Sequence, residues 1–169
     1  FYGRSFFSVQ LLSRGIDVKG GFEAEIMRSI SLNCVLKDDG STVAPGTSLQ
    51  ELRKRLQDTR YGELFVVDEM GRLTGTITLA DLSEAAFDHG FDDLINAGDA
   101  ARLHPPFLTL TDNLEQALNL MSETGEEHIA IVDNNNKMEY QGCIHQRDAM
   151  TAYSRALADV RHEERGETI

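Results

Sequence analysis

Short apolar runs and helix-spaced apolar positions alternate along this chain. Two runs, 64–67 and 129–132, are apolar at every position, which is typical of strands covered on both faces. Ahead of each run, apolar residues recur with the period of one buried helix face. They are Leu49, Leu52 and Leu56 in the first case and Leu114, Ala117, Leu118 and Met121 in the second. We therefore predict two segments in which a helix precedes a buried strand.

The two segments are copies of one pattern. Residues of the same type lie 65 positions apart in this order: Leu49 and Leu114, Val66 and Ile131, Asp68 and Asp133. Beyond the turn that follows, the offset is 67, as for Gly75 and Gly142. The difference falls between turn residues 68–71 and 133–137, where insertions are tolerated. A constant offset on both sides of one turn indicates an internal repeat.

Each copy contains an extended piece, a helix, a strand, a hairpin turn, a second strand and a second helix. The predicted extended pieces are 42–44 and 107–110, and the predicted second helices are 81–87 and 147–157. Capping-box spacing places the starts of the first helices, at Thr47 with Gln50 and at Asp112 with Glu115. So small a unit buries its sheet and helices only by packing on its twin. We predict an α+β fold of two β-α-β-β-α repeats around a pseudo-two-fold axis.

Charge and composition limit the partners. The chain has 28 acidic and 16 basic residues and a formal net charge of -12, which repels nucleic acid and anionic lipid. We therefore expect no nucleic-acid partner. No apolar run approaches the ~18 residues that cross a bilayer. Cys34 and Cys143 are too few for a disulfide framework, and their apolar neighbours favour packed, reduced, inert thiols.

No pattern of catalytic or metal-binding residues is present in the sequence. It contains no Gly-x-Ser-x-Gly, no glycine-rich loop ending in Gly-Lys and no His-Glu-x-x-His. The acid pairs 38–39, 92–93 and 126–127 offer carboxylates to a hard cation, but adjacent acids point apart and their spacing is not that of a calcium loop. We therefore expect solvated acids, no metal site, no catalytic residue and no enzymatic activity.

One stretch carries a family resemblance. Residues 75–81, Gly-Thr-Ile-Thr-Leu-Ala-Asp, follow an apolar strand that ends in Asp68 and resemble the signature of CBS domains. Residues 142–148 repeat it, with His145 where the family usually has Thr or Ser. The resemblance covers 30–153 and implies a tandem CBS pair, or Bateman module, which is a regulatory unit that forms homodimers.

A second resemblance lies upstream. Residues 5–7, 11–17 and 25–29 are similar to the segment that joins the membrane domain of a ClC chloride channel or transporter to its CBS pair. This resemblance implies a soluble regulatory domain at the cytosolic side of the cell membrane, attached to a chloride channel, and a chain beginning at Phe1 that is cut from a longer protein. Three alternatives stay open: the regulatory pair of another transporter, a free-standing nucleotide sensor, and a ligand-free module for dimerisation.

These resemblances divide the chain into five parts. Residues 1–29 are expected to be a linker from the membrane domain, 30–87 the first CBS repeat, 88–99 a polar connector with a helical turn near Leu94, 100–157 the second repeat and 158–169 a charged tail. The tail is expected to be a fraying helix end or disordered.

The family resemblance also implies a ligand. CBS pairs commonly bind adenosine nucleotides between their repeats, so ATP, ADP or AMP is the implied regulatory ligand, and no cofactor is required. The positions carried over from the family are Thr78, Asp81, His145, Arg147 and Asp148. An aspartate offers two acceptors to a ribose diol, and a helix N-terminus favours phosphate. Ordinary capping by the aspartates, a surface ion pair of Arg147, and a local hydrogen bond or pH response of His145 are the competing interpretations.

Overall fold

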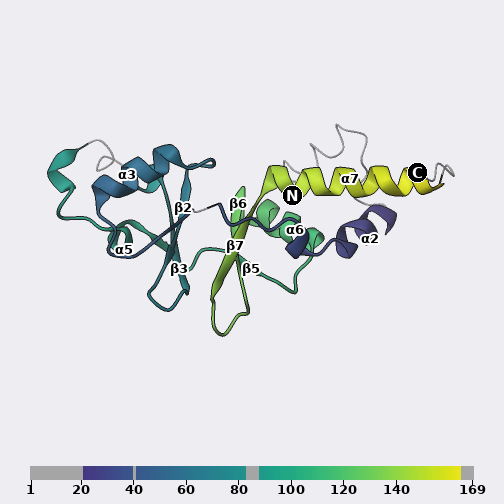
Figure 1. Ribbon diagram of the computed structural model, residues 1–169, viewed down its shortest axis with the longest axis horizontal. Helices are drawn as coiled ribbons and strands as arrows, with labels where there is room; N and C mark the ends of the chain where they lie inside the picture. Colours follow the sequence, from purple (N-terminus) through teal and green to yellow (C-terminus); the bar gives the residue numbers. More distant parts are fainter. Residues whose placement is uncertain (1–20, 40, 83–87, 165–169) are drawn as a thin grey trace, which may run out of the picture. The chain divides into compact units, whose positions relative to one another are not determined.

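The computed structural model describes residues 21–39, 41–82 and 88–164 (Figure 1). Most of the predicted linker (1–20), most of the predicted second helix of the first repeat (83–87) and the end of the predicted tail (165–169) therefore lie outside the described residues. The chain divides into two compact units, each assembled from separate stretches of sequence. The sheet unit comprises 37–109 and 130–143, and the helical unit comprises the remaining residues.

A four-stranded sheet organises the first part of the sheet unit. Its order is β1-β2-β3-β4, with β1 parallel to β2 and the other neighbours antiparallel. The strands are β1 (Thr42–Val43), β2 (Glu63–Val67), β3 (Leu73–Thr78) and β4 (Arg102–Leu103). The helices of this part are α3 (Leu49–Asp58), α4 (Leu79–Leu82), the 3-10 turn η3 (His89–Phe91) and α5 (Ala97–Ala100).

The apolar face of α3 packs on this sheet. Leu49 and Leu52 are fully buried in one cluster with Leu64 and Ile77, as the periodicity predicts. The start of α3 differs by one residue from our prediction: Ser48 is the N-cap, and its hydroxyl accepts from the amide of Glu51. The predicted box of Thr47 with Gln50 is wrong, because the adjacent Ser48 is an equally good capping residue.

A second sheet packs against the first. Its order is β5-β6-β7, formed by β5 (Phe107–Thr109), β6 (His128–Val132) and β7 (Tyr140–His145). Phe65 and Leu73 of the first sheet share one buried cluster with residues of the second, and the rings of Phe65 and Tyr140 lie 5.8 Å apart between centroids. Within the sheet unit, the repeats therefore complete each other's core.

The two hairpins also join by their backbones. The Leu73 amide donates to the Met138 carbonyl at 2.8 Å, and the Tyr140 amide donates to the Gly71 carbonyl at 2.9 Å. Between these bonds Arg72 faces Glu139 in an antiparallel bridge. Each hairpin thus pairs with the same part of its copy.

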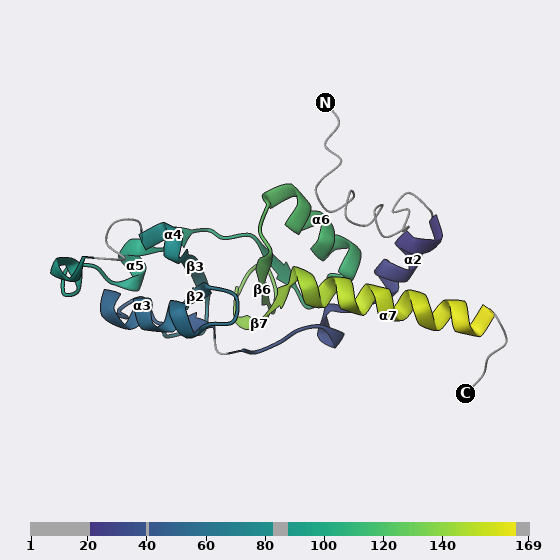
Figure 2. The same ribbon diagram turned by 90° about the horizontal axis from the view of Figure 1, so that it is seen from above.

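Helices make up most of the helical unit. They are α2 (Gly21–Ser29), the 3-10 turn η1 (Leu32–Cys34), α6 (Leu114–Thr124) and α7 (Gln146–Glu164). Helix α2 contacts both α6 and α7, and α6 contacts α7 (Figure 2). Ile26 and Met27 of α2 are buried, so the last part of the predicted linker is helical and packed.

Helix α6 has a capping box one residue later than predicted. Asn113 is the N-cap, and its side chain and that of Gln116 each accept from the other's backbone amide. The predicted pair of Asp112 with Glu115 is wrong. Glu115 instead lies 2.6 Å from the Nε of Arg28 on α2, so it ties two helices together.

Matching hydrogen bonds mark the repeat. The Leu49 amide donates to the Ile95 carbonyl at 3.2 Å in the sheet unit, and the Leu114 amide donates to the Ile30 carbonyl at 3.1 Å in the helical unit. Both donors and both acceptors are 65 positions apart. The α+β fold with two repeated domains is confirmed.

Other boundaries differ from the predictions. Helix α4 begins at Leu79, earlier than position 81, because Thr78 caps it. Helix α7 continues to Glu164, so 158–164 is helical. The predicted helical turn near Leu94 is present, since its amide donates to the Phe91 carbonyl at 3.0 Å. Among the described helices, none is both long and apolar enough to cross a membrane.

Candidate functional site

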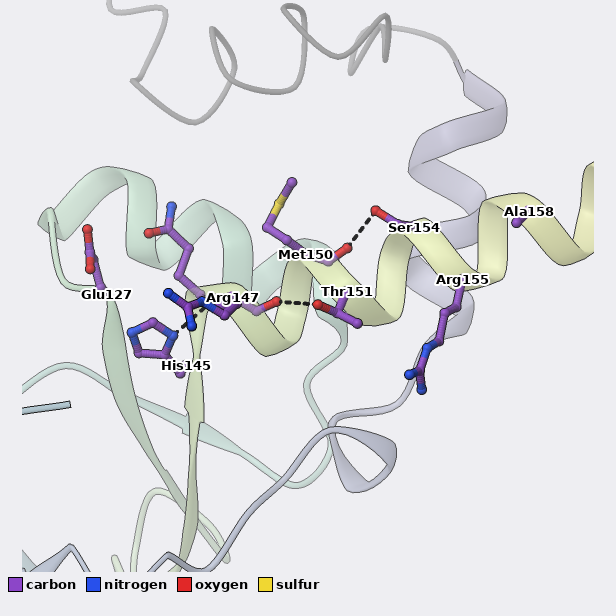
Figure 3. Close-up of a pocket in the computed structure, with 9 residues that line it drawn as sticks. Glu127, His145, Arg147, Met150, Thr151, Ser154, Arg155 and Ala158 are labelled. Atoms are coloured by element: carbon purple, nitrogen blue, oxygen red, sulfur yellow. Dashed lines mark hydrogen bonds between the residues drawn. The ribbon is translucent and has the colours of Figure 1, made fainter. Parts of the chain in front are cut away.

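An open groove runs along the first half of α7 (Figure 3). It has a volume of about 640 Å³, within the size range of small-molecule sites. Helix α7 provides most of the lining, and Glu127 and His145 complete it. The α7 residues are Gln146, Arg147, Met150, Thr151, Ser154, Arg155 and Ala158.

Helical periodicity brings these side chains to one face. Positions 147, 151, 154, 155 and 158 are three or four residues apart or adjacent, so they form one stripe. Arg147 and Arg155 are exposed and provide two guanidinium groups that can donate to an anion. The groove therefore carries two cationic side chains and one carboxylate, that of Glu127, although the chain as a whole is acidic.

The two hydroxyls of the groove bond back into the helix. Thr151 Oγ1 donates to the Arg147 carbonyl and Ser154 Oγ donates to the Met150 carbonyl, both at 2.9 Å (Figure 3). Because their protons are used within α7, the oxygen lone pairs are what these hydroxyls offer to the groove. They can accept from hydroxyl or amino groups of a ligand, while the arginines donate.

His145 caps the start of α7. Its Nδ1 accepts from the Arg147 amide at 3.1 Å, so a neutral ring carries its proton on Nε2. Burial lowers the pKa of His145, and the nearby His128, whose ring centroid lies 6.0 Å away, lowers that pKa further. Glu127 and Asp148 act in the opposite direction. The lowered pKa favours the neutral ring of His145 at neutral pH.

The predicted residues of the second repeat are only partly brought together. His145 and Arg147 both line the groove. Asp148, the third residue of α7, is half-buried and is not among the lining residues.

Thr78 and Asp81 of the first repeat form a capping box at α4. Asp81 Oδ2 accepts from the Thr78 amide at 2.8 Å and from the Thr78 hydroxyl at 2.9 Å. The Thr78 hydroxyl lies 3.4 Å from the Asp81 amide, which donates to it. Arg102 adds an ion pair, with its Nε 3.0 Å from Asp81 Oδ1.

Sequence reasoning missed several of these residues. Thr151, Ser154 and Arg155 follow Arg147 at helical spacing, so projecting the predicted helix around its axis would have found them. Arg102 lies 21 positions from Asp81 in sequence, in a stretch we took for the beginning of the second repeat. No local pattern marks that contact.

Comparison with protein families identifies the two repeats. The model of the CBS domain matches residues 24–88 and 97–155, which together include both capped helix starts that follow β3 and β7. The chain belongs to the CBS domain family. The first CBS match begins within α2 and therefore includes part of the segment that we assigned to a linker.

The chain is also similar to two uncharacterised proteins and, in fold, to a solved CBS-pair protein. An uncharacterised 17.7 kDa protein of Acidianus ambivalens is 28% identical over 120 residues, covering 70% of this chain and 67% of its own. An uncharacterised protein of Methanopyrus kandleri is 26% identical over 140 residues, covering 81% and 69%. The fold is similar to that of CBSX2 from Arabidopsis thaliana in complex with AMP, with a TM-score of 0.64, 20% identity, and coverage of 75% of this chain and 98% of that one.

The glycine of the first CBS signature has a packing role. A Cβ at Gly75 would lie 2.8 Å from the Cβ of Ala101 and 3.1 Å from the carbonyl oxygen of Arg102. Gly75 pairs with Leu103 across β3 and β4. Glycine at this position thus allows the close approach of β4, which in turn places Arg102 beside Asp81.

Proposed function

We propose that this CBS pair is a regulatory module that binds an adenine nucleotide in the α7 groove. The observation that carries the proposal is the local chemistry of the groove: Arg147 and Arg155, with His145 at the head of a 19-residue helix, in a chain of net charge -12. Two arginines against one carboxylate, that of Glu127, give the groove a positive formal charge in an acidic chain, which favours an anionic ligand.

Each part of a nucleotide has a complementary group. The phosphate is expected near Arg147 at the start of α7, where the helix dipole favours negative charge. The lone pairs of Thr151 and Ser154 are acceptors for ribose hydroxyls or the amino group of the base. CBSX2, which shares the fold, has been solved with AMP, and this supports an adenosine monophosphate as the first ligand to test.

Binding would act by shifting conformations. A nucleotide changes the equilibrium between two arrangements only by its difference in affinity for them, and a difference of about 1–3 kcal/mol is enough for regulation. The proposed role is therefore binding and coupling, with no chemical step on the nucleotide.

Isothermal titration calorimetry with AMP, ADP, ATP and adenosine tests this function. We expect AMP to bind more tightly than adenosine, and R147A to weaken AMP binding about tenfold or more because a charge-assisted hydrogen bond to phosphate is lost. R161A is the matched control, since Arg161 is an exposed arginine near the end of the same helix. Absence of binding by every nucleotide at millimolar concentration would rule the proposal out.

A ligand-free assembly module is the second candidate. It is favoured by the engagement of Thr78 and Asp81 in a capping box with an ion pair, which accounts for both residues without a ligand. In this case the chain is expected to form a homodimer whose sedimentation coefficient does not change with nucleotide.

The narrower hypothesis of a chloride-channel domain stays a prediction. Most of its residues, 5–7 and 11–17, lie outside the described part of the chain, and none of the relatives named above is described as a channel. These relatives favour a CBS pair that regulates another protein or senses nucleotide on its own. Sequence of the gene upstream of the Phe1 codon tests the channel hypothesis directly.

A further inference from the structure

Arg102 forms an ion pair with the carboxylate of Asp81 in the first repeat. Its Nε lies 3.0 Å from Oδ1 and 3.1 Å from Oδ2 of Asp81, so the guanidinium lies across both oxygens. The Asp81 side chain retains only 16% of its exposure, whereas that of Arg102 retains 43%. The contact therefore joins an exposed arginine to a largely buried carboxylate.

The Asp81 carboxylate has few lone-pair positions left to accept hydrogen bonds from a ligand. A carboxylate offers about four lone-pair positions, and Asp81 already accepts from the Thr78 amide, the Thr78 hydroxyl and Arg102 Nε. A ribose diol needs two acceptors. It could use Asp81 only by displacing one of these donors, and Arg102 is the one that does not belong to the capping box.

The backbone holds Arg102 in this position. Strand β4 pairs with β3, and Arg102 stands opposite Thr76. Thr76 donates its hydroxyl to the buried carboxylate of Glu63, and Arg102 Nη2 lies 4.0 Å from the same carboxylate. Arg102 is therefore placed near two acids, and moving it away would leave the buried Glu63 without this neighbouring cation, which is unfavourable in a low dielectric.

We propose that Arg102 takes the place of a ligand at Asp81 and thereby prevents nucleotide from binding to the first repeat. This inference rests on the proposed function, because it asks whether the first repeat offers a second nucleotide site, with Asp81 as the ribose acceptor that the CBS resemblance implies. It makes the two repeats unequal: the chain binds one nucleotide, in the α7 groove, and Arg102 is the positioning residue that determines this stoichiometry.

Calorimetry with AMP on the whole chain tests the inference. The wild type is expected to bind one equivalent and R102A two, while R72A stays at one. R72A is a matched control because Arg72 also pairs with an aspartate, Asp68, at 2.8 Å, but on a hairpin turn. In an R147A background, R102A is expected to restore one tight equivalent. Two equivalents in the wild type, or one in folded R102A, would overturn the inference.

A ligand-free measurement separates this inference from the proposed function. The Arg102 Nε–H resonance in a 1H–15N spectrum is expected to be protected from water exchange in the wild type. It is expected to lose this protection in D81N. The R102K variant keeps the positive charge but has no Nε, so the loss of the resonance in R102K assigns it to Arg102. If neither wild type nor R102A binds AMP, the proposed function fails, and a protected Nε–H lost in D81N still supports the closed carboxylate. Fast exchange that D81N does not alter would refute the contact.

Discussion

Arg72 and Glu139 face each other in an antiparallel bridge, although they are 67 positions apart and occupy the same place in the two repeats. A residue that pairs with its own counterpart lies next to a local two-fold axis. The flanking bonds, from Leu73 to Met138 and from Tyr140 to Gly71, keep the same relation. The hairpins of the repeats therefore form one hydrogen-bonded unit, and the sheets behind them share a core.

Truncation of Phe65 tests how much this shared core contributes to the stability of the fold. Phe65 is 1% exposed and belongs to the cluster that includes residues of both sheets. We expect F65A to lower the free energy of unfolding by about 3–5 kcal/mol, since a large side chain is lost without replacement. Urea unfolding monitored by circular dichroism measures the change. M70A is the control, because Met70 is 71% exposed, and it should change stability by less than about 0.5 kcal/mol.

Addition of one methyl group at Gly75 tests the close approach of β4. The new Cβ would meet Ala101 and the backbone of Arg102 at distances that require a shift. We expect G75A to lower the free energy of unfolding by about 1–3 kcal/mol, as overpacking does. In thermal unfolding, G46A should have little effect, because a Cβ at Gly46 meets nothing within 4 Å. Equal stability of G75A and the wild type would contradict the proposed packing role of this glycine.

The two thiols should differ in reactivity. Cys34 is exposed, whereas Cys143 is buried, contrary to our prediction that both are packed. Burial, followed by the negative charge of Asp39, raises the pKa of the Cys143 thiol to about 12. Titration with Ellman's reagent at pH 8 should therefore detect one thiol per native chain and two after denaturation, because only thiolates react. A native C34S chain that still reacts rapidly would disprove this assignment.

His145 should weaken the fold in mild acid. Its folded-state pKa is lowered from 6.5 by burial, so below about pH 6.5 the unfolded chain binds more protons than the folded one. Stability should therefore fall as the pH falls from about 6.5 toward the folded-state pKa. Urea unfolding at pH 7.5 and 5.5 should show a smaller loss in H145Q than in the wild type. H104Q, altered at an exposed histidine, should keep the loss, and an unchanged pH dependence in H145Q would exclude this role.

Periodicity and internal repetition were sufficient to predict the elements that the two repeats share, but not α2, α5 or β4. The apolar runs became β2 and β6, and the leucines of α3 became its buried face. Helix starts were missed by one residue because Thr47 and Ser48, like Asp112 and Asn113, are adjacent and both suitable as caps. The length of α7 was underestimated because its last turns are charged but contain no Pro or Gly to end the helix.

The candidate site was less predictable than the fold. Arg147 and His145 belong to a motif that local sequence can indicate, and both line the groove. The ion pair of Arg102 with Asp81 depends on how β4 is laid beside β3. That pairing joins residues that are distant in sequence, so neither local propensity nor residue spacing predicts it.

The matched bonds at Leu49 and Leu114 bear on how such a chain could arise. In each repeat the first helix is anchored by a carbonyl that lies ahead of the other repeat, Ile95 in one case and Ile30 in the other. An ancestral single copy could form the same bond by reciprocal exchange with a second molecule. Gene duplication would then have fused a swapped dimer into one polypeptide, and cutting the chain between its repeats would separate each anchor from the helix it holds.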